Sequence, residues 1–119
     1  MPRVMIIDDS PAELKMMESI LISKSYAVTP VLNGEGAEEQ IATNRPDIIL
    51  LDVVMPGRNG YEILRALKRN PTSKDIPVIM VSSKGEDTDI AWGKRQGATD
   101  YVTKPYTAET VLSTLKKYV

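Results

Sequence analysis

The chain has 119 residues, a formal net charge of −1 and neither cysteine nor histidine, and its length fits a single domain over residues 1–119. With 15 basic against 16 acidic side chains it offers no basic field for a nucleic acid backbone, and the two missing residue types exclude disulfides, Ser-His-Asp catalysis and histidine-ligated zinc. No apolar run approaches the ~20 residues that span a bilayer, so we expect a soluble, cytoplasmic protein that binds neither nucleic acid nor membrane.

Five short apolar runs have the length and composition of β-strands. In chain order they lie at Val4–Ile7, Ala27–Val31, Ile48–Leu51, Val78–Val81 and Asp100–Thr103. The third and fourth runs are apolar without alternation, which is typical of central parallel strands that are covered on both faces. We therefore predict a sheet whose middle strands are fully buried.

Helical patterns fill the segments between these runs. Ser10 as N-cap, Pro11 at the first helical position and Glu13 three residues after the cap predict a capping box that opens the first helix. Further helices are predicted at Gly36–Asn44, Tyr61–Lys68, Asp87–Gln96 and Ala108–Tyr118. Four methionines are assigned to the core, namely Met5, Met16, Met17 and Met80. For Trp92, in the fourth helix, packing is favoured over partner recognition.

The strict alternation of strands and helices predicts an α/β fold, in which a doubly wound parallel sheet carries helices on both faces. We expect five strands in the order 2-1-3-4-5 and five helices. Ligands of such folds bind at the carboxyl ends of the strands, where the strand order reverses. In this order the reversal falls between the first and third strands.

Polar side chains follow four of the five predicted strands. They are Asp8 and Asp9 after the first, Asp52 after the third, Ser82 and Ser83 after the fourth, and Lys104 after the fifth. Taken alone, two acids at the start of a helix also suit its positive end. Facing Asp52 across the crevice, however, they form a cluster of carboxylates that resist ionising unless a cation is bound. Oxygen ligands without imidazole or thiolate predict Mg²⁺.

Four motifs in register resemble the receiver domain of two-component response regulators. They are IIDDS at 6–10, LLDVVMPGRNGYEIL at 50–64, PVIMVSSK at 77–84 and GATDYVTKPY at 97–106. The resemblance covers essentially the whole chain and implies the flavodoxin-like receiver fold. DDSPAE and DTDIAWGKRQGATDY further resemble the single-domain regulators of the chemotaxis-like system that controls type IV pili and twitching motility.

The resemblance implies a phosphorylation site on Asp52, with Mg²⁺ bound directly by Asp9 and Asp52 and through water by Asp8. The backbone carbonyl of Val54 completes the implied protein ligands of the metal. A carboxylate nucleophile needs little else from the protein, because Mg²⁺ and a lysine hold the charge of the transferred group.

Other matched positions imply roles around the phosphoryl group. Lys104 binds its oxygens, Ser82 supplies a switch hydroxyl, and the backbone N–H of Ser83 is a further donor. Tyr101 matches the aromatic residue that turns inward on activation. The resemblance also implies a cis peptide bond between Lys104 and Pro105.

The implied function is that of a stand-alone response regulator, a signalling protein that catalyses only its own phosphorylation and dephosphorylation. The resemblance implies a histidine kinase as the phosphoryl donor, and the absence of histidine fits this, since the donor phosphohistidine must then come from another protein. We expect a monomer in chemotaxis-like control of type IV pilus twitching motility. Its downstream protein target is expected to bind the face made by the fourth helix, fifth strand and fifth helix.

Two rival functions use similar residues. A haloacid-dehalogenase phosphatase needs a second acid two residues after its nucleophile, whereas Asp8 and Asp9 are adjacent. A receiver-like module that binds partners without being phosphorylated usually lacks one of the acids or the lysine, and this chain has them all. Phosphorylation is therefore the favoured prediction.

Overall fold

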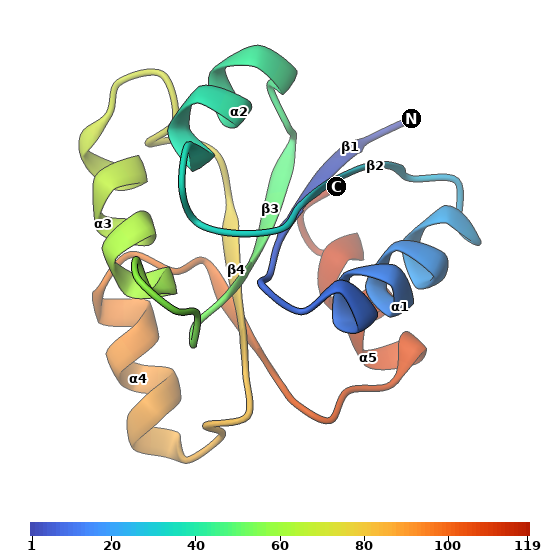
Figure 1. The fold of residues 1–119 in the computed structure, drawn as a ribbon. Coiled ribbons are helices and arrows are strands. Elements are labelled where there is room, and N and C mark those ends of the chain that lie inside the picture. Colours follow the sequence, from blue (N-terminus) through green and yellow to red (C-terminus); the bar gives the residue numbers. More distant parts are fainter.

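A computed structural model, which describes residues 1–119, shows a parallel sheet with helices on both faces (Figure 1). The strands are β1 (Arg3–Ile7), β2 (Ala27–Val31), β3 (Ile48–Asp52), β4 (Val78–Ser82) and β5 (Asp100–Thr103). The helices are α1 (Pro11–Ile22), α2 (Ala37–Asn44), α3 (Gly60–Arg69), α4 (Asp87–Arg95) and α5 (Ala108–Lys116). The strand order is β2-β1-β3-β4-β5, which confirms the predicted fold.

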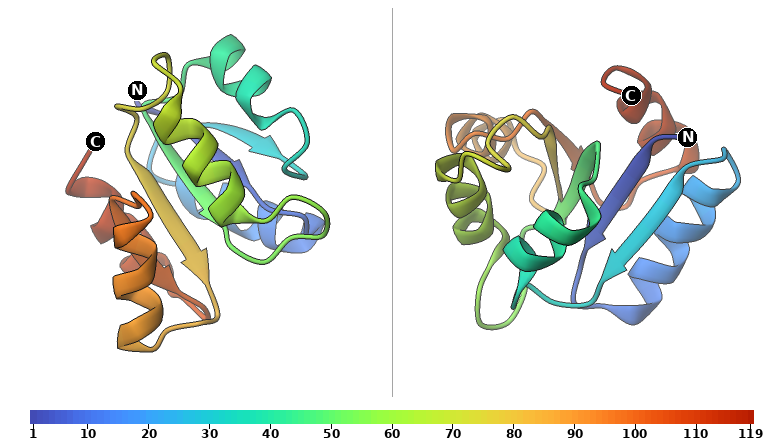
Figure 2. Two further views of the ribbon diagram at one scale, coloured as in Figure 1. Left: turned by 90° about the vertical axis from the view of Figure 1, so that its left-hand side faces the viewer. Right: turned by 90° about the horizontal axis from the view of Figure 1, so that it is seen from above.

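The two faces of the sheet carry separate apolar clusters. Helices α1 and α5 cover one face, and α2, α3 and α4 lie on the other (Figures 1 and 2). Along β1, Val4 and Ile6 pack into the cluster beneath α1 and α5, whereas Met5 and Ile7 pack into the cluster on the opposite face. Both faces of the central strands are thus apolar, which explains their runs without alternation. The longest helix, α1, has 12 residues, and none of the helices meets the requirements for crossing a membrane.

Several element boundaries differ from the predicted ones, each for a local reason. Strands β3 and β4 include Asp52 and Ser82, because these residues still pair with neighbouring strands. Helix α2 begins one residue late, since Gly36 caps it with a left-handed φ of 71°. Helix α5 ends at Lys116, and beyond it the Tyr118 hydroxyl donates to Asp100 at 2.8 Å.

Two predictions about the core are wrong. Met16 is 51 % exposed, because the buried stripe of α1 runs through Leu14, Met17 and Leu21. Trp92 is 47 % exposed, and the guanidinium carbon of Arg95 lies 5.8 Å from the centre of its ring. Gly93 is the only buried residue of α4, so the Trp92 side chain points outward. The favoured interpretation, in which Trp92 packs into the core, is therefore wrong.

Candidate functional site

The carboxyl ends of the strands form one edge of the sheet, on its lower side in Figure 1. The residues predicted to carry chemistry stand at this edge. Asp8 and Asp9 follow β1, Asp52 ends β3, Ser82 ends β4 and Lys104 follows β5. Strand β2 lies on one side of β1 and the other strands lie on its far side. This edge therefore contains the reversal point at which ligands of such sheets bind.

Three carboxylates meet at the reversal point. One oxygen from each of Asp8, Asp9 and Asp52 lies within 4.8 Å of the others. Asp8 and Asp52 are each 6 % exposed, and Asp9 is half-buried. The Asp8 carboxylate also accepts a hydrogen bond from the Ser10 N–H at 2.9 Å. A partly dry set of oxygen donors, without nitrogen or sulfur, fits a hard divalent cation such as Mg²⁺.

Lys104 supplies the positive charge of this cluster. Its Nζ lies 3.0 Å from Asp52 Oδ1, 3.0 Å from Glu13 Oε2 and 3.6 Å from Asp8 Oδ2. Burial opposes the lysine charge, but hydrogen bonds to Glu13 and Asp52 outweigh it and raise the pKa of Lys104. The ammonium therefore stays protonated. The peptide bond between Lys104 and Pro105 is cis, as the family resemblance implies.

The carboxylates of the cluster are held in conditions that disfavour their ionised forms. Burial raises the pKa of Asp8 to about 6; the Ser10 N–H opposes this rise and the Asp52 charge adds to it. Burial likewise raises the pKa of Asp52, against the hydrogen bond that Lys104 donates to it. One lysine is therefore not enough to offset the burial and mutual repulsion of these acids.

Replacement of Asp8 by asparagine is expected to stabilise the metal-free protein at neutral pH. The folded-state pKa of about 6 lies above the ordinary 3.8, so the contribution of Asp8 to stability is complete below 3.8 and is lost as the pH rises through 6. Asparagine does not ionise, and its oxygen can still accept the Ser10 N–H. The free energy of unfolding, measured with urea in the presence of a chelator, should rise by about 1–2 kcal/mol, allowing for water at the site.

The gain from Asp8→Asn should fade as the pH is lowered from 6 and should be gone below 3.8, where the Asp8 carboxyl is protonated in both the folded and the unfolded protein. Asp75→Asn, at an exposed position between α3 and β4, is the matched control and should show no such pH-dependent gain. An Asp8→Asn protein that is less stable than wild type at neutral pH would contradict this account.

The other residues predicted to line the site occupy two different settings. Ser82 lies one residue beyond the strand partner of Asp52 and is 1 % exposed. Its hydroxyl accepts the Lys84 N–H at 3.1 Å, which leaves its own proton available for donation. Ser83 and Val54 are exposed residues in the loops that follow β4 and β3. Ser83 lines a concavity together with Glu13 and Lys104, and Val54 lies two residues after Asp52.

Tyr101 lies outside the cluster. Its hydroxyl donates to the Lys84 carbonyl at 2.7 Å, in the loop between β4 and α4. A Cβ added to Gly93 would lie 3.1 Å from the Tyr101 ring, so the ring packs directly against α4. Tyr101 thus links the loop after Ser82 to the helix that carries Trp92.

Glu13 is a site residue that the capping pattern conceals. Ser10 Oγ accepts the Glu13 N–H at 3.3 Å, as a capping box requires. The reciprocal bond is absent, because the Ser10 N–H donates to Asp8 and the Glu13 carboxylate reaches Lys104 instead. The predicted capping box is therefore only half formed. Glu13 is an acidic residue in the first turn of α1, and α1 begins at the edge where the carboxylates gather. This position is the signal that could have identified Glu13 as a site residue.

Gly60 fixes the position of the loop that follows Asp52. A Cβ at Gly60 would lie 2.2 Å from the Asp52 carbonyl oxygen, closer than atoms can approach. The Gly60 N–H donates to the Val53 carbonyl at 2.9 Å. Helix α3 can therefore begin directly against the end of β3 only because this residue has no side chain.

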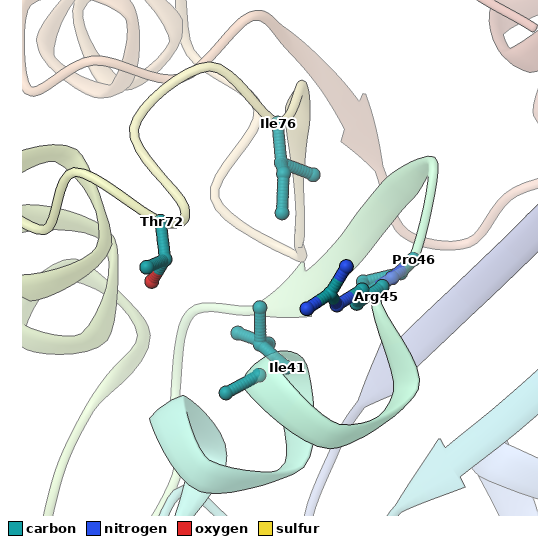
Figure 3. A pocket seen from close by; sticks show the side chains of 6 residues that line it. Ile41, Arg45, Pro46, Thr72 and Ile76 are labelled. Carbon is teal, nitrogen blue, oxygen red and sulfur yellow. The ribbon is translucent and has the colours of Figure 1, made fainter.

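A concavity at the opposite edge of the sheet lacks comparable chemistry. Figure 3 shows its lining, which consists of Ile41, Ala42, Arg45, Pro46, Thr72 and Ile76. Arg45 is the only ionisable residue among these six, and no carboxylate faces it from the lining. The carboxylate cluster with Lys104 is therefore the candidate functional site.

Comparisons with known proteins match the whole of this architecture. The family model for the response regulator receiver domain matches residues 4–116. Protein PilH of Pseudomonas aeruginosa is 42% identical over 115 residues, which cover 97% of this chain and 95% of that protein. The structure of the Vibrio cholerae chemotaxis protein CheY4 has a TM-score of 0.92 at 30% identity and covers 100% of this chain and 99% of that one.

A further solved structure contains a metal ion. It is the receiver domain of the sensor histidine kinase PA1611 from Pseudomonas aeruginosa PAO1, with a magnesium ion coordinated in its active site cleft. The TM-score is 0.89 at 25% identity, and the match covers 98% of this chain and 96% of that one.

Proposed function

This chain belongs to the response regulator receiver domain family, and on that premise we propose that it signals through reversible phosphorylation of Asp52. The observation that carries the proposal is the contact of Asp52 Oδ1 with Lys104 Nζ at 3.0 Å, inside a cluster that also contains Asp8 and Asp9. Transfer of a phosphoryl group to an aspartate requires a nucleophilic carboxylate, further acids and a fixed ammonium.

In the proposed reaction, an Asp52 carboxylate oxygen forms a bond to the phosphorus of a phosphohistidine on a kinase in trans. The bond between phosphorus and the histidine nitrogen breaks as this bond forms, and the nitrogen keeps the electron pair. Lys104 lies where its ammonium can donate to the transferred oxygens. Ser82 can donate its hydroxyl proton, and the backbone N–H of Ser83 is proposed as a further donor.

The residues that would hold the metal are Asp9 and Asp52 directly, Asp8 through water, and the carbonyl of Val54. Support comes from the three carboxylate oxygens within 4.8 Å of one another. Bound Mg²⁺ would neutralise negative charge that develops on the transferred group. Asp8 and Asp52, which ionise reluctantly without a cation, would then be fully charged.

The output is proposed to pass through Tyr101 to the face made by α4, β5 and α5. Attraction of the Ser82 hydroxyl toward a phosphoryl group would disturb the loop whose Lys84 carbonyl accepts the Tyr101 hydroxyl. The ring packs on Gly93, so its movement would shift α4 and the exposed Trp92. A downstream protein that prefers one of the two states would read this change.

The biological setting is proposed to be chemotaxis-like control of type IV pilus twitching motility. Its support is the similarity to PilH over 97% of this chain, together with the motifs in α1 and α4. We further propose that residues 1–119 act as one stand-alone domain, because the match with PilH extends over 95% of that protein. The chain would then act as a signalling protein and not as an enzyme with a separate substrate.

Incubation with acetyl phosphate and Mg²⁺, followed by intact-mass measurement, tests the proposal. We expect the mass of one phosphoryl group to be added, and the gain to disappear when a chelator replaces Mg²⁺. This result would also separate a phosphorylated regulator from a receiver-like module that only binds partners. Absence of any mass gain under conditions in which Mg²⁺ binds would overturn the proposed function.

Lys104→Ala is expected to weaken the binding of beryllofluoride, a stand-in for the phosphoryl group, by about 10- to 100-fold at saturating Mg²⁺. The variant loses a charge-assisted donor beside Asp52, so the bound anion lacks its lysine partner. Mg²⁺ affinity should be retained or increased, because a cation that competes for Asp8 and Asp52 is gone. Both affinities can be measured by calorimetry.

Lys117→Ala is the matched control for Lys104→Ala. Lys117 also faces an aspartate, Asp100 at 3.7 Å, but its side chain is 64 % exposed and distant from the site. Both affinities should be unchanged in this control. Native beryllofluoride affinity in Lys104→Ala would exclude the proposed role of the lysine.

A further inference from the structure

Glu13 lies beside the carboxylate cluster but has no part in the function proposed above. Its carboxylate accepts a hydrogen bond from Lys104 Nζ at 3.0 Å, across 91 positions of the chain. The Glu13 side chain is 38 % exposed, whereas that of Asp52 is 7 % exposed. Glu13 and Lys104 also line an open concavity together with Ser83. Glu13 therefore stands on the solvent side of the lysine, at the mouth of the site.

Lys104 is shared among three carboxylates. Its Nζ is equally close to Glu13 and Asp52, at 3.0 Å, and lies 3.6 Å from Asp8. An ammonium has only three N–H donors. A donor that Glu13 engages is lost to Asp8, to Asp52 and to any group bound to Asp52. Glu13 thus competes with the acids of the cluster for the lysine.

The charges around the cluster do not balance. The carboxylates of Asp8, Asp9, Asp52 and Glu13 face the ammonium of Lys104, which leaves a formal excess of three negative charges. A divalent cation reduces this excess, whereas a phosphoryl group on Asp52 increases it. Glu13 contributes to both effects through its charge, because Coulomb interactions act beyond direct contact. It should therefore favour the cation and oppose the anion.

We propose that Glu13 is a positioning residue that sets the balance between cation binding and phosphoryl binding at this site. By competing with Asp8 and Asp52 for Lys104, its carboxylate weakens the hold of the lysine on these two acids and so favours Mg²⁺. It also obliges a phosphoryl group on Asp52 to compete for the lysine. This inference rests on the proposed function and adds a residue that adjusts the relative affinities of the site for Mg²⁺ and for a phosphoryl group. Lys104 has the reverse effect, since it favours the phosphoryl group and competes with Mg²⁺.

Glu13→Gln separates this role from a structural one. Glutamine has the same length as glutamate but no charge, so it removes most of the attraction for Lys104. The N-cap bond of α1 is unaffected, because Ser10 Oγ accepts the backbone N–H of residue 13 and not its side chain. The side chain is also partly exposed, so the exchange leaves no cavity. A structural defect would lower the affinities for both Mg²⁺ and beryllofluoride, whereas loss of the Glu13 charge should change these two affinities in opposite directions.

The experiment uses calorimetry on the whole chain, first with MgCl₂ and then with beryllofluoride at saturating Mg²⁺. For Glu13→Gln we expect Mg²⁺ to bind about threefold more weakly and beryllofluoride about threefold more tightly, a modest change because water screens a partly exposed carboxylate. Glu18→Gln is the matched control, since Glu18 lies on the same helix without an ion pair to Lys104. Its affinities should equal those of wild type.

The outcomes distinguish the inference from its premise. Wild type that binds Mg²⁺ but no beryllofluoride would overturn the proposed function and this inference with it. If wild type binds both ligands and Glu13→Gln leaves the affinities unchanged, or shifts both in the same direction, only the inference fails. Opposite shifts in Glu13→Gln, with none in Glu18→Gln, would support it.

Discussion

Asp52→Asn is expected to abolish phosphoryl incorporation from acetyl phosphate, with no residual mass gain in the presence of Mg²⁺. An asparagine amide is not a nucleophile under these conditions, and no cysteine or histidine in the chain could accept the group instead. The exchange keeps the shape of a side chain that is 7 % exposed and removes one charge from the cluster. Loss of incorporation is therefore expected from a folded protein.

The control for Asp52→Asn is Asp75→Asn, which neutralises an exposed acid and should be phosphorylated like wild type. A second check is thermal unfolding of the metal-free proteins, which shows whether Asp52→Asn remains folded. A mass gain that persists in folded Asp52→Asn would move the phosphorylation site to another residue.

The three central strands, β1, β3 and β4, were predictable because an uninterrupted apolar run marks a strand that is buried on both faces. Residues of β1 alternate between two apolar clusters, so no polar position interrupts the run. The boundaries were less predictable, since β3 and β4 each continue into a polar residue. Asp52 pairs with Val81, and Ser82 pairs with Thr103, so backbone pairing decides where these strands end.

The candidate site was largely predictable because the topology converts chain order into position. Parallel strands bring every strand end to one edge, so acids and a lysine that are far apart in the sequence converge there. The oxygens of Asp8, Asp9 and Asp52 do meet, and Lys104 contacts two of these acids. The chemical roles of these residues stay predictions.

Side-chain directions were the least predictable feature. Glu13 turns toward a lysine 91 residues away, and a local capping pattern contains no trace of that partner. Trp92 was expected to be buried because large aromatic residues usually are. Helix α4 instead approaches the sheet through Gly93, which leaves room for the Tyr101 ring and turns Trp92 to the solvent. Such choices depend on tertiary contacts that short patterns do not encode.

Asp9→Ala is expected to abolish measurable Mg²⁺ binding while leaving the fold intact. Asp9 supplies one of the three converging carboxylate oxygens, and Asp8 and Asp52 would remain as a pair already engaged by Lys104. Asp9 itself forms no ion pair with the lysine, so its removal leaves the resting contacts in place. The loss of a negative charge near Asp52 should also ease the ionisation of Asp52, because the Asp9 charge contributes to its raised pKa.

The measurement for Asp9→Ala combines calorimetric titration with thermal unfolding at increasing Mg²⁺. Wild type should become more stable as the metal is added, because a ligand that binds only the folded state shifts the unfolding equilibrium. The melting temperature of Asp9→Ala should not respond to Mg²⁺, and without metal it should equal or exceed that of wild type. Asp87→Ala, an exposed acid in the first turn of α4, should keep the full response. Mg²⁺ affinity that is unchanged in Asp9→Ala would place the metal elsewhere and remove the basis for a carboxylate site at the end of β1.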